Sequence, residues 1–251
     1  MDTFEHYRKI PALNNSGMNN LAISPAHYLA GMESHKTTPA LEFGRAFHEA
    51  VLEPEVFEKH YVIFKGDKRT KAQRELYQSI LDAGNEPIKE CDYETLLRIQ
   101  DSVAKHPEAM EIITSSKHEV THTWNDEASG AACKCRTDCE HPDYVADLKT
   151  TVSASKYDFM YSIRKYKYQR QAAFYLDGCK RQSFYFIAVE KTPPYGVNVF
   201  LMSDTVIQEG RDLYEPMCEL YQQCITTGEW PTLRDKAVQG GSPIHLITSL
   251  L

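Results

Sequence analysis

The sequence lacks the features that would place the protein in a membrane or a secretory pathway. None of its 251 residues belongs to an apolar run approaching the ~18 residues of a membrane span. The first residues, Met1 to His6, contain neither the basic region nor the apolar core of a signal peptide. We therefore expect a cytoplasmic protein that makes no contact with a membrane.

Motifs for nucleotide-driven or serine-based chemistry are also absent. The chain has no Gly-x-Ser-x-Gly elbow and no glycine-rich GxxxxGK phosphate loop, so nothing supports the use of ATP. There are seven cysteines, an odd number in a chain without an export signal, and we expect them to be mainly reduced. No internal repeat, low-complexity tract or linker divides the chain.

Positive charge is the minority charge. The 28 Lys and Arg residues face 35 Asp and Glu residues, which gives a net charge of −7. This balance argues against a nonspecific basic coat for DNA, but a local basic channel remains possible because phosphate affinity depends on where the cations sit. With 42% hydrophobic and 25% charged residues, the composition is that of a globular protein with an adequate core.

Hydrophobic periodicity predicts an α/β protein with a mixed sheet and helices packed on it. Helices are expected over 16–32, 41–52, 92–105, 155–161, 168–176 and 204–227, with Ser16, Ser24, Asp92 and Asp204 as N-caps. Strands are expected over 60–64, 119–124, 131–138, 144–149, 183–189 and 197–202. We interpret the chain as one domain, with a helical N-terminal part (1–115), a sheet core (116–203), and a C-terminal helix (204–230) and tail.

The strongest local signal is Asp138 followed by Asp147-Leu148-Lys149. On a strand, Asp147 and Lys149 point to the same face, and Asp138 on the preceding strand can lie alongside them. Two carboxylates beside an ammonium group form a site for a hard cation such as Mg²⁺, which keeps water ligands for a phosphate substrate. The alternative from spacing alone is a surface ion pair at a strand end.

Two helical segments carry further polar residues. His48 lies beside the most apolar stripe of its helix, and Gln171 and Tyr175 are four residues apart on one helix face. Taken singly, each is more typical of a helix surface or of a packed polar edge. Their interest comes from their combination with the acidic residues.

Two other motifs suggest metal sites but are better explained by structure. His118-Glu119-Val120-Thr121-His122 matches the HExxH pattern, yet its β-branched residues favour a strand, where the two His would lie about 13 Å apart. Cys133, Cys135, Cys139 and His141 do not have the spacing of paired zinc ligands, and we interpret these cysteines as buried structural thiols.

Together the motifs resemble the PD-(D/E)XK nucleases of the RecB and lambda-exonuclease type. The order is Gly44…His48, Asp138, Asp147-x-Lys149 and Gln171-x-x-x-Tyr175. The segments Leu13–Ser16, Ser24–Tyr28, Phe43–Pro54 and Asp67–Lys71 look like the nuclease domain of exonuclease VIII, the RecE type. The resemblance covers roughly residues 7 to 230 and implies a restriction-endonuclease-like core, a central mixed β-sheet flanked by helices.

The resemblance also implies roles for individual residues. The metal ligands would be His48, Asp138, Asp147 and the carbonyl of Leu148, holding Mg²⁺ or, in its place, Mn²⁺. Lys149 would be the catalytic lysine and Glu119 a further acidic residue of the site, while Gln171 and Tyr175 would position the strand being cut. In the family the first Asp commonly follows a Pro or a Gly-rich turn, whereas here it follows Cys135-Arg136-Thr137.

The activity implied is that of a Mg²⁺-dependent 5′–3′ exodeoxyribonuclease on double-stranded DNA ends, without ATP. Such enzymes leave 3′ single-stranded tails for a RecT-like annealing protein in recombination of phage or prophage type, and form toroidal homo-oligomers (trimers or tetramers). The DNA channel would be lined by Lys65, Lys68, Arg69, Lys71, Arg164, Lys165, Lys167 and Arg170. A 5′-phosphate pocket would involve Arg8, Lys9 and Ser16.

Two alternatives remain open at this stage. One is a structure-specific endonuclease on the same scaffold, and the other is a DNA-binding or assembly protein that does not cleave. The basic segments are also compatible with solvated faces that contact no DNA.

Overall fold

The computed structural model describes residues 4–33 and 38–233. The strands are β1 (Tyr61–Ile63), β2 (Glu86–Ile88), β3 (Lys117–Asn125), β4 (Ala132–Glu140), β5 (Tyr144–Thr151), β6 (Ser183–Glu190) and β7 (Val197–Leu201). The helices are α1 (Phe4–Lys9), α2 (Asn15–Ile23), α3 (Pro25–Glu33), α4 (Pro39–Leu52), α5 (Pro54–His60), α6 (Lys71–Asp82), α7 (Glu90–Ala104), α8 (Pro107–Ser115), α9 (Lys156–Lys165), α10 (Tyr168–Cys179) and α11 (Asp204–Thr227). None of these helices is long and apolar enough to cross a membrane.

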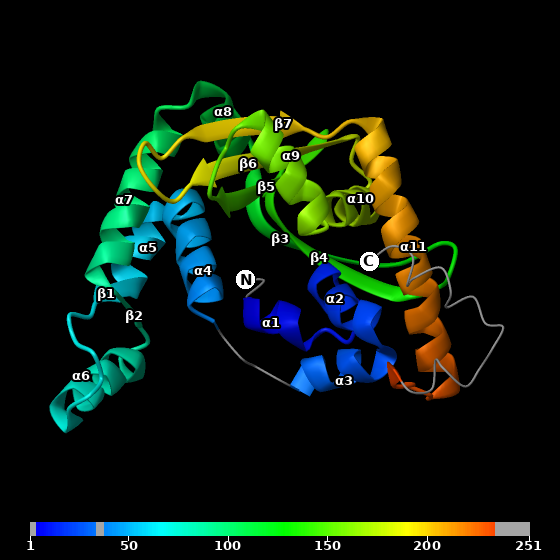
Figure 1. The fold of residues 1–251 in the computed structure, drawn as a ribbon, viewed down its shortest axis with the longest axis horizontal. Helices are drawn as coiled ribbons and strands as arrows, with labels where there is room; N and C mark the ends of the chain where they lie inside the picture. The colour runs from blue at the N-terminus through cyan, green and yellow to red at the C-terminus, as the bar shows by residue number, and fades with distance from the viewer. Residues whose placement is uncertain (1–3, 34–37, 234–251) are drawn as a thin grey trace.

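The main sheet has five strands in the order β3-β4-β5-β6-β7 (Figure 1). All neighbours are antiparallel except β5 and β6, which are parallel and joined by α9 and α10. This confirms the predicted mixed sheet with helices packed on it, including the predicted hairpin of β6 and β7. A separate two-stranded parallel sheet pairs β1 with β2.

Two hydrophobic cores flank the sheet and hold the parallel pair between them. Phe184 and Phe186 of β6 pack on the side of α10 and α11, whereas Ile187 and Val189 pack on the side of α4 and α7. Burial on both faces is typical of parallel strands. The middle of the sheet is therefore the most constrained part of the backbone, and β5 lies within it.

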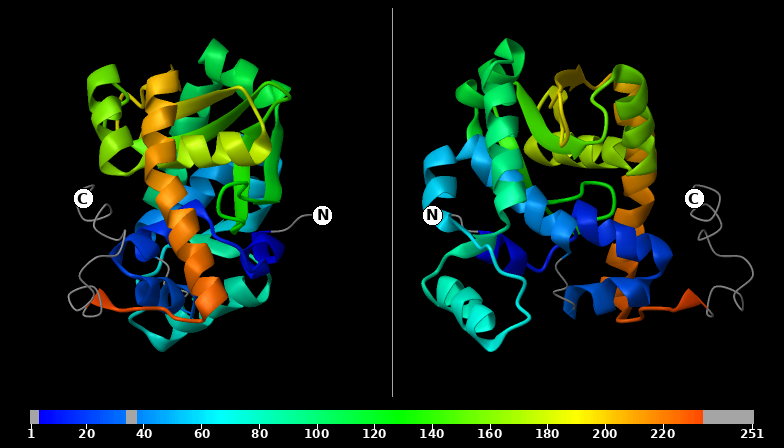
Figure 2. Two further views of the ribbon diagram at one scale, coloured as in Figure 1. Left: turned by 90° about the vertical axis from the view of Figure 1, so that its right-hand side faces the viewer. Right: turned by 60° about the vertical axis from the view of Figure 1, so that its left-hand side comes forward.

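Close packing of helices also fixes α10. A Cβ atom at Gly210 of α11 would collide with the backbone carbonyl of Gln169, so only glycine permits this approach of the two helices. Helix α11 packs against α10 and crosses it on its outer side (Figure 2). The position of α10 matters because it carries Gln171.

The sequence-based prediction missed several helices and displaced most of the caps. Helices α1, α5, α6 and α8 were not expected. In α6 the apolar residues Leu76, Tyr77 and Ile80 do recur at helical spacing, although none of its described residues is buried. Ser24 accepts a hydrogen bond from the backbone of His27, as expected for a cap. The other three predicted caps are wrong: the observed cap residues are Asn14, Lys89 and Ser203.

Candidate active site

The candidate site lies where the pairing of three neighbouring strands opens. Pairing between β3 and β4 is regular on both sides of Glu119 and Asp138, which face each other in register without being paired. Pairing between β4 and β5 covers two residues of each strand and ends one step before Asp138 would meet Asp147. Three carboxylates from three strands are thereby aligned in one row across the sheet.

The backbone at Glu119 is strained. Its φ of 56° lies in the left-handed region, which costs a residue with a side chain roughly 1–2 kcal/mol. Arg136 of β4 holds the Glu119 side chain, with Arg136 Nε 2.6 Å from Glu119 Oε2. Strain held in place by a specific ion pair is typical of residues that a functional site positions.

His48 reaches the row of carboxylates from α4. This helix begins at Pro39 after the N-cap Thr38, whose hydroxyl accepts a hydrogen bond from the backbone of Leu41. The buried Phe47 anchors the helix and leaves His48 at the edge of the core. His48 Nδ1 lies 3.3 Å from Asp138 Oδ1 and 3.9 Å from Glu119 Oε1.

The three side chains are arranged so that they fit a divalent cation. His48, Glu119 and Asp138 each offer one ligand atom, and these atoms lie within 4.8 Å of one another. In the described ranges this is the only such group of His, Cys, Asp or Glu side chains. One imidazole nitrogen with carboxylate oxygens suits Mg²⁺ or Mn²⁺ better than a soft metal.

Asp147 and Lys149 lie on the same side of β5, as their spacing predicts. Lys149 Nζ is 2.6 Å from Asp147 Oδ2, and the amide of Gln171 on α10 donates a hydrogen bond to Asp147 Oδ1. The backbone N–H of Leu148 donates to Asp138 Oδ2 at 2.7 Å and so links the two aspartates through β5. The structure therefore brings the aspartates, the lysine and the glutamine into one hydrogen-bonded group.

The acidic groups compete for positive charge. Burial, reinforced by the charge of Asp138, raises the pKa of Asp147 to about 6. Burial and Asp138 also raise the pKa of Glu119. Burial opposes the ionisation of Asp138 as well, but the charges of His48 and Lys149 outweigh it and hold the pKa of Asp138 below its usual value.

The neighbouring carboxylates raise the pKa values of the two basic groups, His48 and Lys149. Burial acts to lower the pKa of His48, but the Asp138 carboxylate outweighs it and raises the pKa to about 9. Burial also acts to lower the pKa of Lys149, and the charges of Asp147 and Asp138 raise it above the usual value. In the metal-free protein, the imidazolium and the ammonium therefore provide the positive charge that the carboxylates need.

Tyr175 lies deeper than the other predicted site residues. It is buried in the core on the α10 side, and its ring meets that of Phe184 edge-on. Burial raises the pKa of its hydroxyl well above the usual value, with smaller contributions from nearby groups that include Asp147 and Asp138. The Tyr175 hydroxyl is therefore close enough to the two aspartates for their charges to affect its pKa. Its role in positioning DNA stays a prediction, as do the roles of the other site residues.

The two basic segments expected to line a channel lie in different parts of the molecule (Figure 1). The 65–71 segment, beside α6, is exposed: Lys65 pairs with Glu90, and Lys68 lies over the ring of Tyr77. Arg164 and Lys165 lie in the last turn of α9, where Arg164 pairs with Glu209 of α11. Whether these residues contact DNA stays a prediction.

Arg170 does not belong to an exposed basic surface, and this part of the prediction is wrong. Its side chain is buried, with Nε donating to Asn15 Oδ1 at 2.9 Å and Nη2 to Asn19 Oδ1 at 2.7 Å. The guanidinium joins α10 to α2, and burial lowers its pKa to about 10. The run of basic residues crosses from the exposed end of α9 into a helix buried on nearly all sides.

The predicted 5′-phosphate residues are exposed at the N-terminal side. Arg8 and Lys9 end α1, and Ser16 lies in the first turn of α2. The amine of Lys134 on β4 donates to the backbone carbonyls of Tyr7, Arg8 and Ile10 and so ties α1 to the sheet. A phosphate pocket here stays a prediction.

The HExxH pattern at residues 118–122 and the cysteines between 133 and 139 both have structural roles. His118 and His122 lie on β3, so the predicted strand is confirmed and the HExxH pattern is not on a helix. His118 Nε2 contacts the carbonyl of Ile113 at 2.9 Å, while His122 pairs with Glu140 at 2.6 Å. Cys133, Cys135 and Cys139 are buried in the cores, and all seven cysteines are free thiols, as expected.

Two residues of the site were missed by sequence reasoning. Arg136 holds Glu119, and its Nη1 is buried without a hydrogen-bond partner among the described residues. Tyr168 places its ring 4.9 Å from Lys149 Nζ. Arg136 lies two residues before Asp138 on β4, and residues two apart on a strand point to the same face. This spacing was the sequence signal that could have placed Arg136 in the site.

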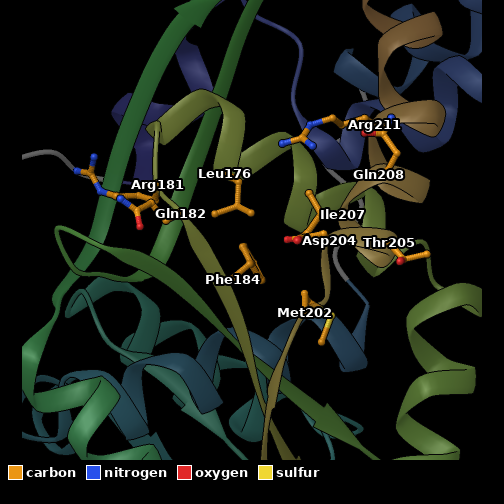
Figure 3. A pocket seen from close by; sticks show the side chains of 10 residues that line it. All are labelled: Leu176, Arg181, Gln182, Phe184, Met202, Asp204, Thr205, Ile207, Gln208 and Arg211. Atoms are coloured by element: carbon orange, nitrogen blue, oxygen red, sulfur yellow. The ribbon is translucent and has the colours of Figure 1, made fainter.

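A pocket of about 420 Å³ lies apart from this site, between α10, α11 and the edge of β6 (Figure 3). Phe184, Met202 and Ile207 line it, and none of its lining residues was predicted to act in the site. Arg211 at its rim is engaged by Asp177 at 2.8 Å. The pocket is therefore distinct from the row of carboxylates.

Comparison with known families confirms the predicted fold. Residues 15–238 match the family described as a PDDEXK-like domain of unknown function (DUF3799). The match covers the row of carboxylates, the lysine and the glutamine. No curated protein is detectably similar to the chain.

One solved structure agrees with this chain at the level of the fold. A protein from Eubacterium rectale, described provisionally as an exonuclease, superposes with a TM-score of 0.65 at 16% identity, over 96% of this chain and 93% of that one. A phage-related exonuclease from Haemophilus somnus gives 0.39 at 13% identity, over 88% and 99% of the two chains. The alkaline exonuclease LHK-Exo from Laribacter hongkongensis gives 0.31 at 16% identity, over 77% and 98%. Only the first score supports a shared fold.

We expect divalent metal to stabilise the protein through this site. Mn²⁺ or Mg²⁺ well above its dissociation constant should raise the melting temperature by roughly 5 °C, because binding to the folded state alone adds stability. Thermal unfolding monitored by circular dichroism measures the shift. Asp138→Asn should remove most of it, whereas Asp101→Asn, at an exposed ion pair, should keep it. An unchanged shift in Asp138→Asn would place the metal elsewhere.

We also expect a pH signature in the metal-free protein. The folded-state pKa of Asp147, about 6, lies above the unfolded value, so its contribution to stability is complete below the unfolded pKa and lost as pH rises through about 6. Relative to Asp147→Asn, the wild type should therefore lose on the order of 2 kcal/mol between pH 4 and pH 7. Urea unfolding in EDTA measures this difference, and parallel pH profiles of the two proteins would contradict it.

Proposed function

Because the chain belongs to the PDDEXK-like family DUF3799, we propose that it is a divalent-metal-dependent nuclease, specifically a 5′–3′ exodeoxyribonuclease acting on double-stranded DNA ends. The observation that carries the proposal is the in-register row of Glu119, Asp138 and Asp147 with Lys149 paired to its last member. PDDEXK nucleases typically depend on a divalent metal, and the donor set here fits one.

The metal would be held by His48, Glu119, Asp138 and Asp147, with the Leu148 carbonyl as a further ligand. When bound, it supplies Lewis-acid stabilisation of the phosphate and lowers the pKa of a coordinated water. His48 has to lose its proton to act as a ligand, so binding releases a proton and should strengthen as pH rises. Glu119 joins the ligand set through its position opposite Asp138, where Arg136 holds it.

Lys149 would act as a fixed positive charge next to the scissile phosphate. Its raised pKa keeps it protonated, which favours orienting the attacking water and stabilising negative charge on the phosphate over removing a proton. Gln171 fixes the orientation of the Asp147 carboxylate. Asp147 and Lys149 are held before substrate arrives, because the strand that carries them, β5, is buried on both faces.

The finer parts of the proposal rest on the motif resemblance. They are the 5′–3′ polarity, the 3′ single-stranded tails, a RecT-like annealing partner, a toroidal homo-oligomer and a cytoplasmic place of action in a bacterial host. The provisional description of the Eubacterium rectale protein as an exonuclease agrees with this choice. Mg²⁺ as the natural metal, with Mn²⁺ as a substitute, belongs to the same set of proposals.

Digestion of end-labelled DNA tests the activity. Linear duplex labelled at the 5′ or the 3′ end is incubated with Mg²⁺ or EDTA beside a closed circular control. We expect Mg²⁺-dependent release of the 5′ label first, with the circle intact. Cutting of the circle would support an endonuclease instead, and no cleavage of any substrate would support a binding protein.

Substitutions test the residues in the same assay. Lys149→Ala and Asp147→Ala should each lower the cleavage rate by at least about 10³-fold, because each removes transition-state stabilisation. Folding and DNA binding should be largely preserved. Lys105→Ala, at an exposed lysine paired with Asp101, is the matched control and should cleave at the wild-type rate. Equal rates for wild type and Lys149→Ala would remove the site assignment.

A further inference from the structure

Helix α9 presents aromatic rings to solvent where a surface helix usually presents charge. Its inner side is held in the core by Phe159 and Ile163, both with 0% exposure. Tyr157 and Tyr161, one helical turn apart, are 86% and 66% exposed. The rings therefore do not serve to attach α9 to the protein.

The ring of Tyr161 is connected to the candidate active site by a continuous series of contacts. Lys149 Nζ lies 4.9 Å from the ring centre of Tyr168, whose ring is 5.6 Å from that of Tyr166. Lys165 Nζ lies 5.2 Å from the ring of Tyr166 and 5.9 Å from that of Tyr161. Moving outward from Lys149, aromatic rings and amines thus lead from the site to the surface.

The same segment is locally positive in a chain with a net charge of −7. Residues 156–168 contain four basic side chains and one acidic one, Asp158, which is bound to the Ser155 hydroxyl at the helix N-cap. Arg164 is paired with Glu209 of α11 at 3.0 Å. A cationic segment in an acidic protein attracts a polyanion. The last residue of this segment, Tyr168, lies beside Lys149.

We propose that the tyrosine surface, formed by Tyr157, Tyr161, Lys165 and Tyr166, binds an unpaired stretch of the DNA strand whose phosphate lies at Lys149. Aromatic side chains bind nucleic acid by stacking on base faces, and in a duplex those faces are covered by neighbouring bases. The occupant is therefore single-stranded. The placement at the scissile phosphate rests on the proposed nuclease function, whereas binding of single strands by the surface does not.

Fluorescence anisotropy with the full chain in EDTA tests the proposal without cleavage. The probes are a labelled oligothymidine of about 12 nucleotides and a blunt duplex of the same length. A triple variant, Tyr157→Ala with Tyr161→Ala and Tyr166→Ala, should weaken oligothymidine binding about ten-fold or more. Duplex binding should change less than three-fold.

The matched control keeps the rings and removes only the hydroxyls. Replacing the same three tyrosines by Phe should leave oligothymidine binding within about two-fold of wild type, because stacking uses the ring faces. Wild-type circular dichroism and melting temperature are required of both variants. We expect both variants to fold like the wild type, because the three tyrosine side chains are exposed.

Other results would overturn the proposal. Unchanged oligothymidine binding in the Ala variant, or an equal loss for both probes, would exclude a stacking surface for single strands. Sedimentation of the variants identifies the other occupant: dissociation of an oligomer with DNA binding intact would make this face a contact between copies. Absence of cleavage by the wild-type protein would refute the proposed function alone, since the anisotropy result stands without it.

Discussion

Repulsion between carboxylates held on adjacent strands is the constraint around which this structure is organised. Asp138 and Asp147 lie next to each other at the point where their ladder ends, and Glu119 faces Asp138 from the other side. Buried groups of like charge raise the free energy of the folded state unless cations balance them. Lys149, Arg136 and His48 supply this positive charge.

The fold provides the rigidity that this arrangement needs. The parallel pair β5–β6 is buried between two hydrophobic cores, so the aspartate and lysine of β5 have little freedom to move apart. The glutamine of α10 is fixed in turn by the close approach of α11, which Gly210 permits. Under the proposed function, this rigidity would preorganise the site for a divalent cation and a phosphate, because a flexible site would relax under the repulsion between its carboxylates.

Sequence patterns predicted those parts of the site that lie within one element. The alternation of β5 places Asp147 and Lys149 on one side, and the β-branched residues around His118 and His122 correctly favoured a strand over a metal-binding helix. The same reasoning failed for Arg170, because a run of basic residues does not reveal that its second half enters a buried helix. The sequence shows which residues are charged, whereas the burial of each residue depends on which distant parts of the chain pack against it.

The sequence by itself determined the mixed sheet, the Asp-x-Lys strand and, through the combined motifs, the family. The tertiary structure alone decided that Glu119 faces Asp138, that α4 brings His48 to both, and that Arg136 stabilises the strained backbone of Glu119. It also decided that the lysine of β5 lies beside the ring of Tyr168 on α10, which in turn lies beside the ring of Tyr166 at the end of α9. The physical reason is that periodicity records which face of one element is apolar, while strand register and helix packing arise from contacts between residues far apart in the chain.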